Sequence, residues 1–163
     1  MRFLTPPECD KWIANGPTVG SAHSLSIQLP TESGRMLFIA RNVVDAVMFR
    51  QPCLLHVTNW EIWPSSNNWL LYYRLRQSYG DRLLIEEAPG HLFLEHEMED
   101  MAAFLHLAML FGWDAELRPR APYIAGSLSH HEFLDLYSAD PKQLTELGKV
   151  MTDAKVTVEL RSP

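Results

Sequence analysis

The alternation of hydrophobic and polar residues predicts a chain rich in half-buried strands. Segments with this period of two, or short apolar runs bounded by turn residues, cover residues 25–29, 54–57, 91–96, 114–118, 132–137 and 155–161. In the last segment we expect Val156, Val158 and Leu160 to face the core. Pro119 has no N–H to donate to a neighbouring strand, so residues 114–118 are expected at the edge of the sheet.

Helices are predicted where apolar residues recur every three or four positions behind a capping signature. The predicted segments run from Thr5 to Asn15, over residues 68–79 and 101–111, and from Asp140 to about Val150. The first begins with a capping box formed by Thr5 and Glu8. On the second, one face is expected to be buried, made by Leu71, Tyr72, Leu75 and Tyr79.

Residues 35–49 are open to two interpretations. Residues 36–40 are apolar and could form the second strand of a hairpin, followed by a new helix near Asn42. The whole segment could equally be one helix that ends near Phe49. The cap-like residues Asn42 to Asp45 favour the hairpin.

The order of these elements indicates an α+β fold. Strands alternate with helices, and some of the strands are polar on one face, which predicts a mixed, mainly antiparallel sheet with helices packed on it. No repeat and no linker divides the chain, so residues 1–163 are expected to form a single domain. Residues 1–24 would contribute an N-terminal helix and a loop.

The charge balance narrows the classes of partner. The chain has 20 acidic and 14 basic residues, a net charge of −6, which argues against binding to nucleic acid or to an anionic membrane and suits a basic protein partner. The first residues lack the apolar core of a signal peptide. The longest apolar run, residues 101–113, is too short to cross a bilayer. We therefore expect a cytoplasmic protein.

The densest aromatic stretch lies between Trp60 and Tyr73. Three of the five tryptophans and two of the five tyrosines fall within it, at an expected strand-to-helix transition. Large flat side chains dominate the energetics both of cores and of binding surfaces. Most of these rings are expected to pack in the core. The candidates for a partly exposed binding surface are Glu61, Trp63 and Trp69.

Imidazoles and carboxylates gather in two places where a metal ion could bind. The first group is His91, Glu95 and His96. Alternation along a strand places His91 and Glu95 on one face and His96 on the other, which weakens this group. The second is the run from His130 to Glu132. Neither has the spacing of a known metal motif.

Nucleotide-binding and hydrolase motifs are missing from the sequence. It contains no phosphate-binding loop, no GxGxxG or GxSxG pattern and no HExxH pair. His56 and His106 have apolar neighbours and are expected to be hydrogen-bonded core residues. Cys53 also lies in an apolar run, where a buried, inert thiol is expected, and Cys9 has no signature of a catalytic nucleophile.

Three motifs resemble a small family of uncharacterised bacterial proteins. They are the run WEIWPSS from Trp60, the segment LYYRLR with the following YGD, and APGHLF from Ala88. The resemblance covers residues 55–113 and implies no activity and no functional residues. Small acidic α+β domains of this size are also similar in general character to immunity proteins, which neutralise toxins by binding them.

Two functions from different classes follow. The first is a non-catalytic domain that binds a protein, of immunity or accessory type, and that needs no cofactor. The alternative is a small metal- or carboxylate-dependent enzyme, or a ligand-binding domain, that uses the region of His91, Glu95 and His96. A homo-oligomer whose interface covers the aromatic surface is a further hypothesis.

Overall fold

The computed structural model describes residues 1–16, 23–60, 66–121 and 124–162. They contain eight strands: β1 (Arg2–Leu4), β2 (His23–Gln28), β3 (Cys53–Asn59), β4 (Gly90–Phe93), β5 (Asp114–Pro119), β6 (Ile124–Ser129), β7 (Phe133–Ser138) and β8 (Val158–Arg161). They also contain five helices: α1 (Pro6–Ala14), α2 (Ser33–Val47), α3 (Ser66–Ser78), α4 (Met98–Phe111) and α5 (Pro141–Asp153).

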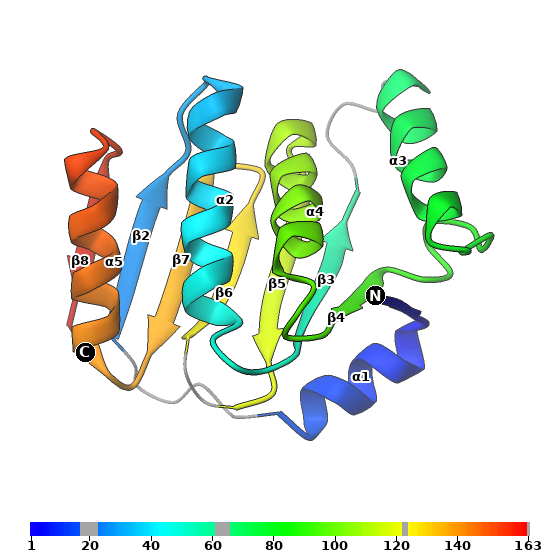
Figure 1. The fold of residues 1–163 in the computed structure, drawn as a ribbon, viewed down its shortest axis with the longest axis horizontal. Coiled ribbons are helices and arrows are strands. Elements are labelled where there is room, and N and C mark those ends of the chain that lie inside the picture. Colours follow the sequence, from blue (N-terminus) through cyan, green and yellow to red (C-terminus); the bar gives the residue numbers. More distant parts are fainter. Residues whose placement is uncertain (17–22, 61–65, 122–123, 163) are drawn as a thin grey trace.

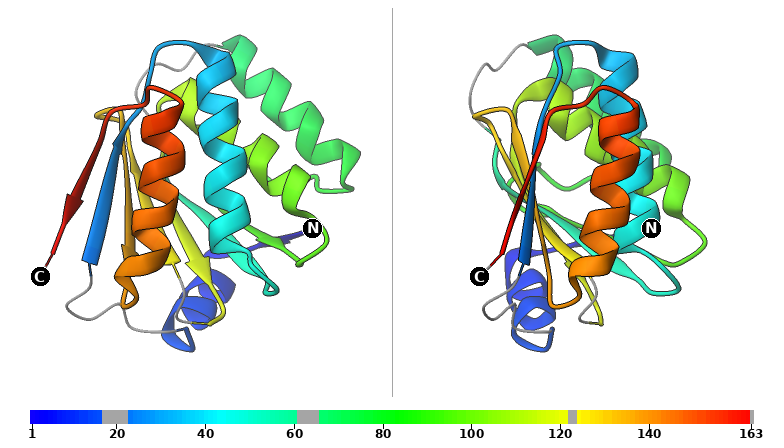
Figure 2. Two further views of the ribbon diagram at one scale, coloured as in Figure 1. Left: turned by 60° about the vertical axis from the view of Figure 1, so that its left-hand side comes forward. Right: turned by 90° about the vertical axis from the view of Figure 1, so that its left-hand side faces the viewer.

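The strands form one sheet in the order β1-β4-β3-β5-β6-β7-β2-β8. Every pairing between described strands is antiparallel. Helices α2, α4 and α5 stand side by side on one face of this sheet, α3 lies beyond the β4 side, and α1 lies below the strand ends (Figure 1). Figure 2 shows the sheet nearly edge-on with α2 and α5 on the same side. The expected α+β fold is confirmed.

The core fills the layer between the sheet and its helices. Ile39 and Val43 of α2, Leu105 of α4 and Leu144 of α5 are completely buried against the strands. Burial of such side chains contributes about 1.5–3 kcal/mol each relative to an exposed position. The core thus runs the length of the sheet, and α2 at its centre packs against both neighbouring helices.

The predicted capping signatures are confirmed at two helices. Glu8 accepts a hydrogen bond from the backbone N–H of Thr5 at 2.9 Å, which completes the capping box of α1. Asp140 accepts from the backbone N–H of Lys142 at 3.0 Å at the start of α5. Each bond satisfies a backbone donor that the first helical turn leaves without a partner.

The hairpin expected at residues 35–49 is wrong, because α2 is one continuous helix from Ser33 to Val47. Its buried residues recur at helical spacing: Ile39, Ala40, Val43, Val44 and Val47. The apolar run in residues 36–40 suggested a strand only when it was considered without the residues that follow it. The amide of Asn42 donates to the Phe38 carbonyl at 2.8 Å within the helix and caps nothing.

Three strand predictions also need correction. Residues 114–118 are central, because β5 pairs with both β3 and β6, and Pro119 simply ends the strand. Strand β8 begins only at Val158 and is an edge strand, and Leu160 is 49% exposed. The sequence did not predict β1 or β6.

Candidate functional site

The described rings of the aromatic stretch, Trp60, Trp69, Tyr72 and Tyr73, pack in or against the core. Trp60 is partly buried, and its ring centroid lies 4.8 Å from that of Trp113 and 5.4 Å from that of Tyr72. Trp69 is also partly buried and lies 6.4 Å from Trp60. The other two predicted binding residues, Glu61 and Trp63, lie outside the described residues.

The buried face of α3 differs from the predicted one. Tyr72 is buried as expected, but Leu71 is 55% exposed and Tyr79 is 37% exposed. Arg76 lies one turn after Tyr72 and takes the inner position, with 1% of its side chain accessible. Its Nε donates to Asp81 at 2.6 Å, so the charge is compensated inside the protein. Hydrophobicity alone therefore mis-assigned this face, because a paired arginine replaces a leucine in it.

His91 is a core residue held by two hydrogen bonds. Its Nδ1–H donates to the Leu55 carbonyl at 3.2 Å, and its Nε2 accepts from the hydroxyl of Tyr72. Burial, together with the nearby charge of Arg76, lowers the pKa of His91 to about 3. The ring is therefore neutral, and both its nitrogens are occupied by protein partners.

The proposed metal group is not brought together. Glu95 and His96 are exposed in the turn after β4, whereas His91 points into the core on the strand before it. Among the described residues, no cluster of three or more His, Cys, Asp or Glu side chains is placed to hold a metal ion. The alternation argument from the sequence had already separated His96 from His91.

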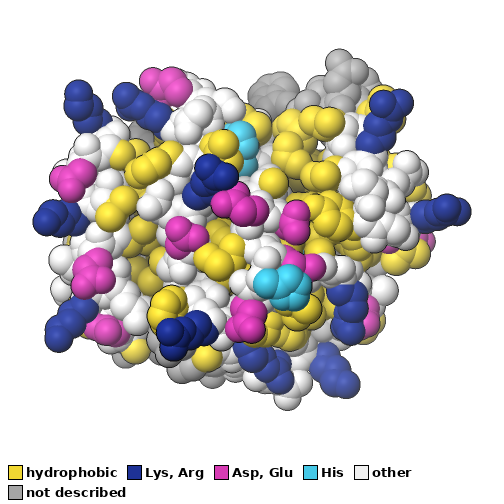
Figure 3. Space-filling model, in the orientation of Figure 1, with side chains coloured by type: hydrophobic (Ala, Val, Ile, Leu, Met, Phe, Trp, Pro, Cys, Tyr) yellow, Lys and Arg dark blue, Asp and Glu magenta, His cyan; other side chains and the backbone are white. Residues whose placement is uncertain are grey.

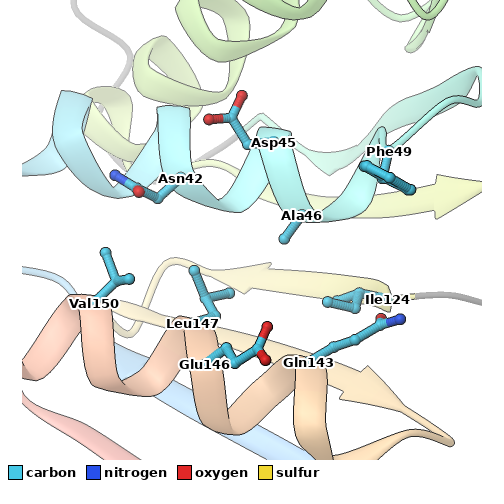
Figure 4. A pocket seen from close by; sticks show the side chains of 9 residues that line it. All are labelled: Asn42, Asp45, Ala46, Phe49, Ile124, Gln143, Glu146, Leu147 and Val150. Carbon is cyan, nitrogen blue, oxygen red and sulfur yellow. The ribbon is translucent and has the colours of Figure 1, made fainter.

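A groove between α2 and α5 is a candidate binding site on the surface. Its volume is about 430 Å³. Three residues of α2 line it, with Phe49 just after that helix, four residues of α5 and Ile124 of β6: Asn42, Asp45, Ala46, Phe49, Gln143, Glu146, Leu147, Val150 and Ile124. Ala46 and Leu147 face one another across the groove, and Val150 points toward the α2 side (Figure 4).

The groove exists because small and short side chains occupy its centre. Ala46 has only a methyl group, so the two antiparallel helices leave a gap above the sheet. At one end Phe49 is 55% exposed, and at the other Val150 is 40% exposed. Apolar side chains that remain accessible around a concavity are typical of a binding site.

The polar rim of the groove is acidic. Asp45 and Glu146 are the charged residues among those that line it, and Asn42 and Gln143 add neutral polar groups. In Figure 4 the Asp45 carboxylate points from α2 away from α5, and Glu146 projects from α5 toward the space between the two helices. The guanidinium of Arg50 lies 5.2 Å from the centroid of the Phe49 ring at the end of the groove.

The sequence contains a pattern that indicates this groove. The spacing i, i+3, i+4, i+7 recurs in the lining residues of both helices, from Asn42 to Phe49 and from Gln143 to Val150. The mistaken hairpin at residues 35–49 removed the first of these faces from consideration. Hydrophobic side chains also gather over α3 and α4 (Figure 3). The exposed leucines of these two helices include Leu70, Leu71 and Leu110.

Comparison with known proteins adds no function to this geometry. No protein-family model matches the chain, and no curated protein or solved structure matches it. Within the described ranges, no helix combines the length and the apolar character needed to cross a membrane. The features that bear on function are therefore the groove and its charges.

Proposed function

We propose that this protein is a non-catalytic binding domain that takes a basic, amphipathic segment of another protein into the groove between α2 and α5. The observation that supports this most strongly is an apolar groove with two carboxylates and no basic residue among its described lining residues. Asp45 and Glu146 would pair with lysine or arginine side chains of the partner. These pairs favour a basic partner over an acidic one.

The apolar contacts would supply most of the affinity. A partner helix that presents large aliphatic side chains at one-turn spacing would place them against Ala46, Leu147 and Val150, between two antiparallel helices. Phe49 would contact the end of that segment, because it is already exposed and Arg50 holds its ring from one side. Helix-in-groove binding of this kind uses i, i+3, i+4 and i+7 anchors.

The overall charge agrees with such a partner. A net charge of −6 favours association with a basic protein and disfavours nucleic acid as the ligand. Both cysteines are unpaired and buried, which suits a reducing compartment such as the cytoplasm.

Two synthetic helical peptides test the proposal. Both carry leucines at i, i+3, i+4 and i+7; one has lysines beside them and the other has glutamates at the same positions. Fluorescence anisotropy of the labelled peptides should show binding of the lysine peptide about fivefold tighter or more at low salt. The difference should shrink as salt screens the exposed pairs.

Substitution of Ala46 tests whether the peptide binds in the groove or elsewhere on the surface. Ala46→Leu fills the centre of the groove and should abolish peptide binding without loss of stability. Ala103→Leu makes the same change at an exposed position of α4 and should leave binding intact. Equal binding of the two peptides, or binding that survives Ala46→Leu, would overturn the proposal.

A second copy of the chain is the competing occupant. The exposed leucines of α3 and α4 would support self-association, in keeping with the homo-oligomer hypothesis. Sedimentation equilibrium of the protein alone distinguishes a second copy from an external partner. A stable dimer that Ala46→Leu disrupts would assign the groove to the second copy and remove the external partner.

A further inference from the structure

A second cavity lies at the upper end of the molecule in Figure 1, where the last turn of α4, the link from β2 to α2 and the β6–β7 hairpin meet. Its volume is about 360 Å³, and it shares no lining residue with the α2–α5 groove. Its walls are mainly apolar, with contributions from Leu29, Met36, Met109, Phe111, Trp113 and Leu128. At the hairpin side the lining becomes polar, with His130 and Glu132.

His130 is held in a fixed orientation by Asp114. The Asp114 carboxylate accepts from the Nδ1 of His130 at 2.9 Å and from its backbone N–H at 2.6 Å, and the amide of Asn59 donates to the same carboxylate at 3.3 Å. Burial raises the pKa of Asp114, but these hydrogen bonds outweigh it and hold the pKa below its usual range. An ionised carboxylate can only accept, so Nδ1 carries the ring proton.

The other ring nitrogen is left available to a ligand. Because Nδ1 directs its proton at Asp114, Nε2 is the ring nitrogen open to a ligand, and within the described part of the chain no group donates to it. The same imidazole–carboxylate arrangement orients histidines at many functional sites. His130 is thus a pre-oriented hydrogen-bond acceptor at the edge of an apolar cavity.

Glu132 adds a carboxylate to the rim of the cavity, and the backbone of this residue has an unfavourable conformation. Its φ is 67°, the left-handed region that favours glycine, in the turn closed by its own N–H to the Ser129 carbonyl at 3.1 Å. Its side chain is exposed, and no described basic residue forms an ion pair with it. Strain of this kind, kept at the rim of a cavity, points to a use for the side chain.

We propose that this cavity binds a small organic amine with an aromatic or branched aliphatic body. The body would fill the space beside Met109 and Trp113, and the ammonium group would lie between the Glu132 carboxylate and the Nε2 of His130. No lysine or arginine is among the described lining residues, so a cation is favoured over an anion of the same shape.

Three probes of similar shape and different charge test this site by isothermal titration calorimetry. They are 2-phenylethylamine, 2-phenylethanol and phenylacetate. The amine should bind about fivefold tighter or more than the alcohol, and phenylacetate should bind weakest. The indole N–H resonance of Trp113 should shift on titration with the amine, because this ring lines the cavity.

The variants distinguish a direct contact from a loss of structure. Glu132→Gln should lower amine affinity about fivefold and leave alcohol affinity unchanged. His130→Gln should weaken both the amine and the alcohol, which need the Nε2 acceptor. His131→Gln is the control, because the His131 ring lies next to that of His130, with centroids 3.9 Å apart, but does not line the cavity.

Two results would overturn the proposal: equal affinity for all three probes, including no binding of any, or an equal loss of amine and alcohol affinity in Glu132→Gln. The groove variant Ala46→Leu should not change amine binding. The proposal for the cavity can therefore be tested independently of the proposal for the groove.

Discussion

Arg76 and Asp81 form an ion pair inside the protein, with 1% and 6% of their side chains accessible. The Phe3 ring covers the guanidinium, whose carbon lies 5.0 Å from the ring centroid. The Nη1 of Arg76 is buried and has no hydrogen-bond partner among the described residues. The pair links α3 to the loop that follows it, and it replaces the apolar contact that the sequence pattern predicted there.

Breaking this pair from one side should be strongly destabilising. Asp81→Asn leaves a buried guanidinium without a counter-charge, which should lower the free energy of unfolding by about 3–5 kcal/mol. Urea denaturation followed by circular dichroism measures the change. The double variant Arg76→Met with Asp81→Asn should recover most of the loss, because methionine can fill the slot under Phe3. A double variant no more stable than Asp81→Asn would show that the charge is not what matters.

The neutral state of His91 predicts how stability depends on pH. The pKa of His91 falls from an ordinary 6.5 to about 3 in the folded protein, so below pH 6.5 the unfolded chain binds a proton that the folded chain does not. Stability should therefore fall by up to about 1.4 kcal/mol per pH unit as pH drops from 6.5 toward 3. His91→Gln should flatten this dependence, measured by denaturation at several pH values.

An exposed histidine provides the control for that experiment. His96→Gln changes a side chain in the solvated turn after β4 and should leave the slope as it is in the parent protein. Tyr72→Phe removes the hydroxyl that donates to His91 and should cost about 1–3 kcal/mol at neutral pH. If stability still falls with pH to the same extent in His91→Gln, the pH dependence comes from other groups. His56 is one such group, because burial also lowers its pKa.

Two glycines should respond in opposite ways to alanine. A Cβ at Gly90 would lie 2.4 Å from the Sγ of Cys9 and 3.0 Å from the Cβ of Leu4, so Gly90→Ala should destabilise by about 1–3 kcal/mol. Gly34, in the first turn of α2, has nothing within 4 Å of that position. Gly34→Ala should stabilise by about 0.5–1 kcal/mol. Thermal melts of both variants measure these two changes in stability. A Gly90→Ala variant as stable as the parent protein would contradict the close packing of Gly90 against α1.

Left-handed residues provide another matched pair. Glu132 and Lys155 have φ values of 67° and 60°, so glycine at either position should raise the free energy of unfolding by about 1 kcal/mol. Only Glu132→Gly should also weaken binding of 2-phenylethylamine. A loss of stability in both variants would mean that the two turns do not hold these side chains under strain.

Both thiols should resist modification in the folded protein. Burial raises the pKa of Cys9 to about 11, and burial also raises the pKa of Cys53. Since the thiolate is the reactive form, iodoacetamide should label neither at mildly alkaline pH until denaturant is added. Mass spectrometry of the intact protein reads the number of adducts, and rapid native labelling at Cys53 would contradict its place in the core.

The sequence predicted those parts of the fold that local chemistry determines. The capping box at Thr5 and Glu8 and the cap at Asp140 depend on neighbouring residues, and both are where the pattern placed them. Whether β5 is a central or an edge strand cannot be predicted from its own residues. Whether a strand is central or at an edge is decided by its partners, and those of β5 include a segment, β6, that has no clear strand pattern.

The candidate sites could be predicted only in part, for the same reason. His91 was singled out as a candidate ligand, but its partners Leu55 and Tyr72 come from distant segments, and no spacing in the sequence pairs them. The dyad of His130 and Asp114 likewise joins the tip of one hairpin to the start of another strand. The groove required that α2 be recognised as one helix, which its full pattern allowed.

The place of β2 in the sheet has a consequence for how the chain folds. His23 pairs with Ser138, and Leu25 pairs with Leu160, so both neighbours of β2 are synthesised long after it. Until then β2 has two open edges and an apolar face without a strand partner, the kind of surface that associates with other chains. Contacts between such distant segments slow folding. We therefore expect the half of the sheet that contains β2 to form late and to be the part most prone to aggregation during synthesis.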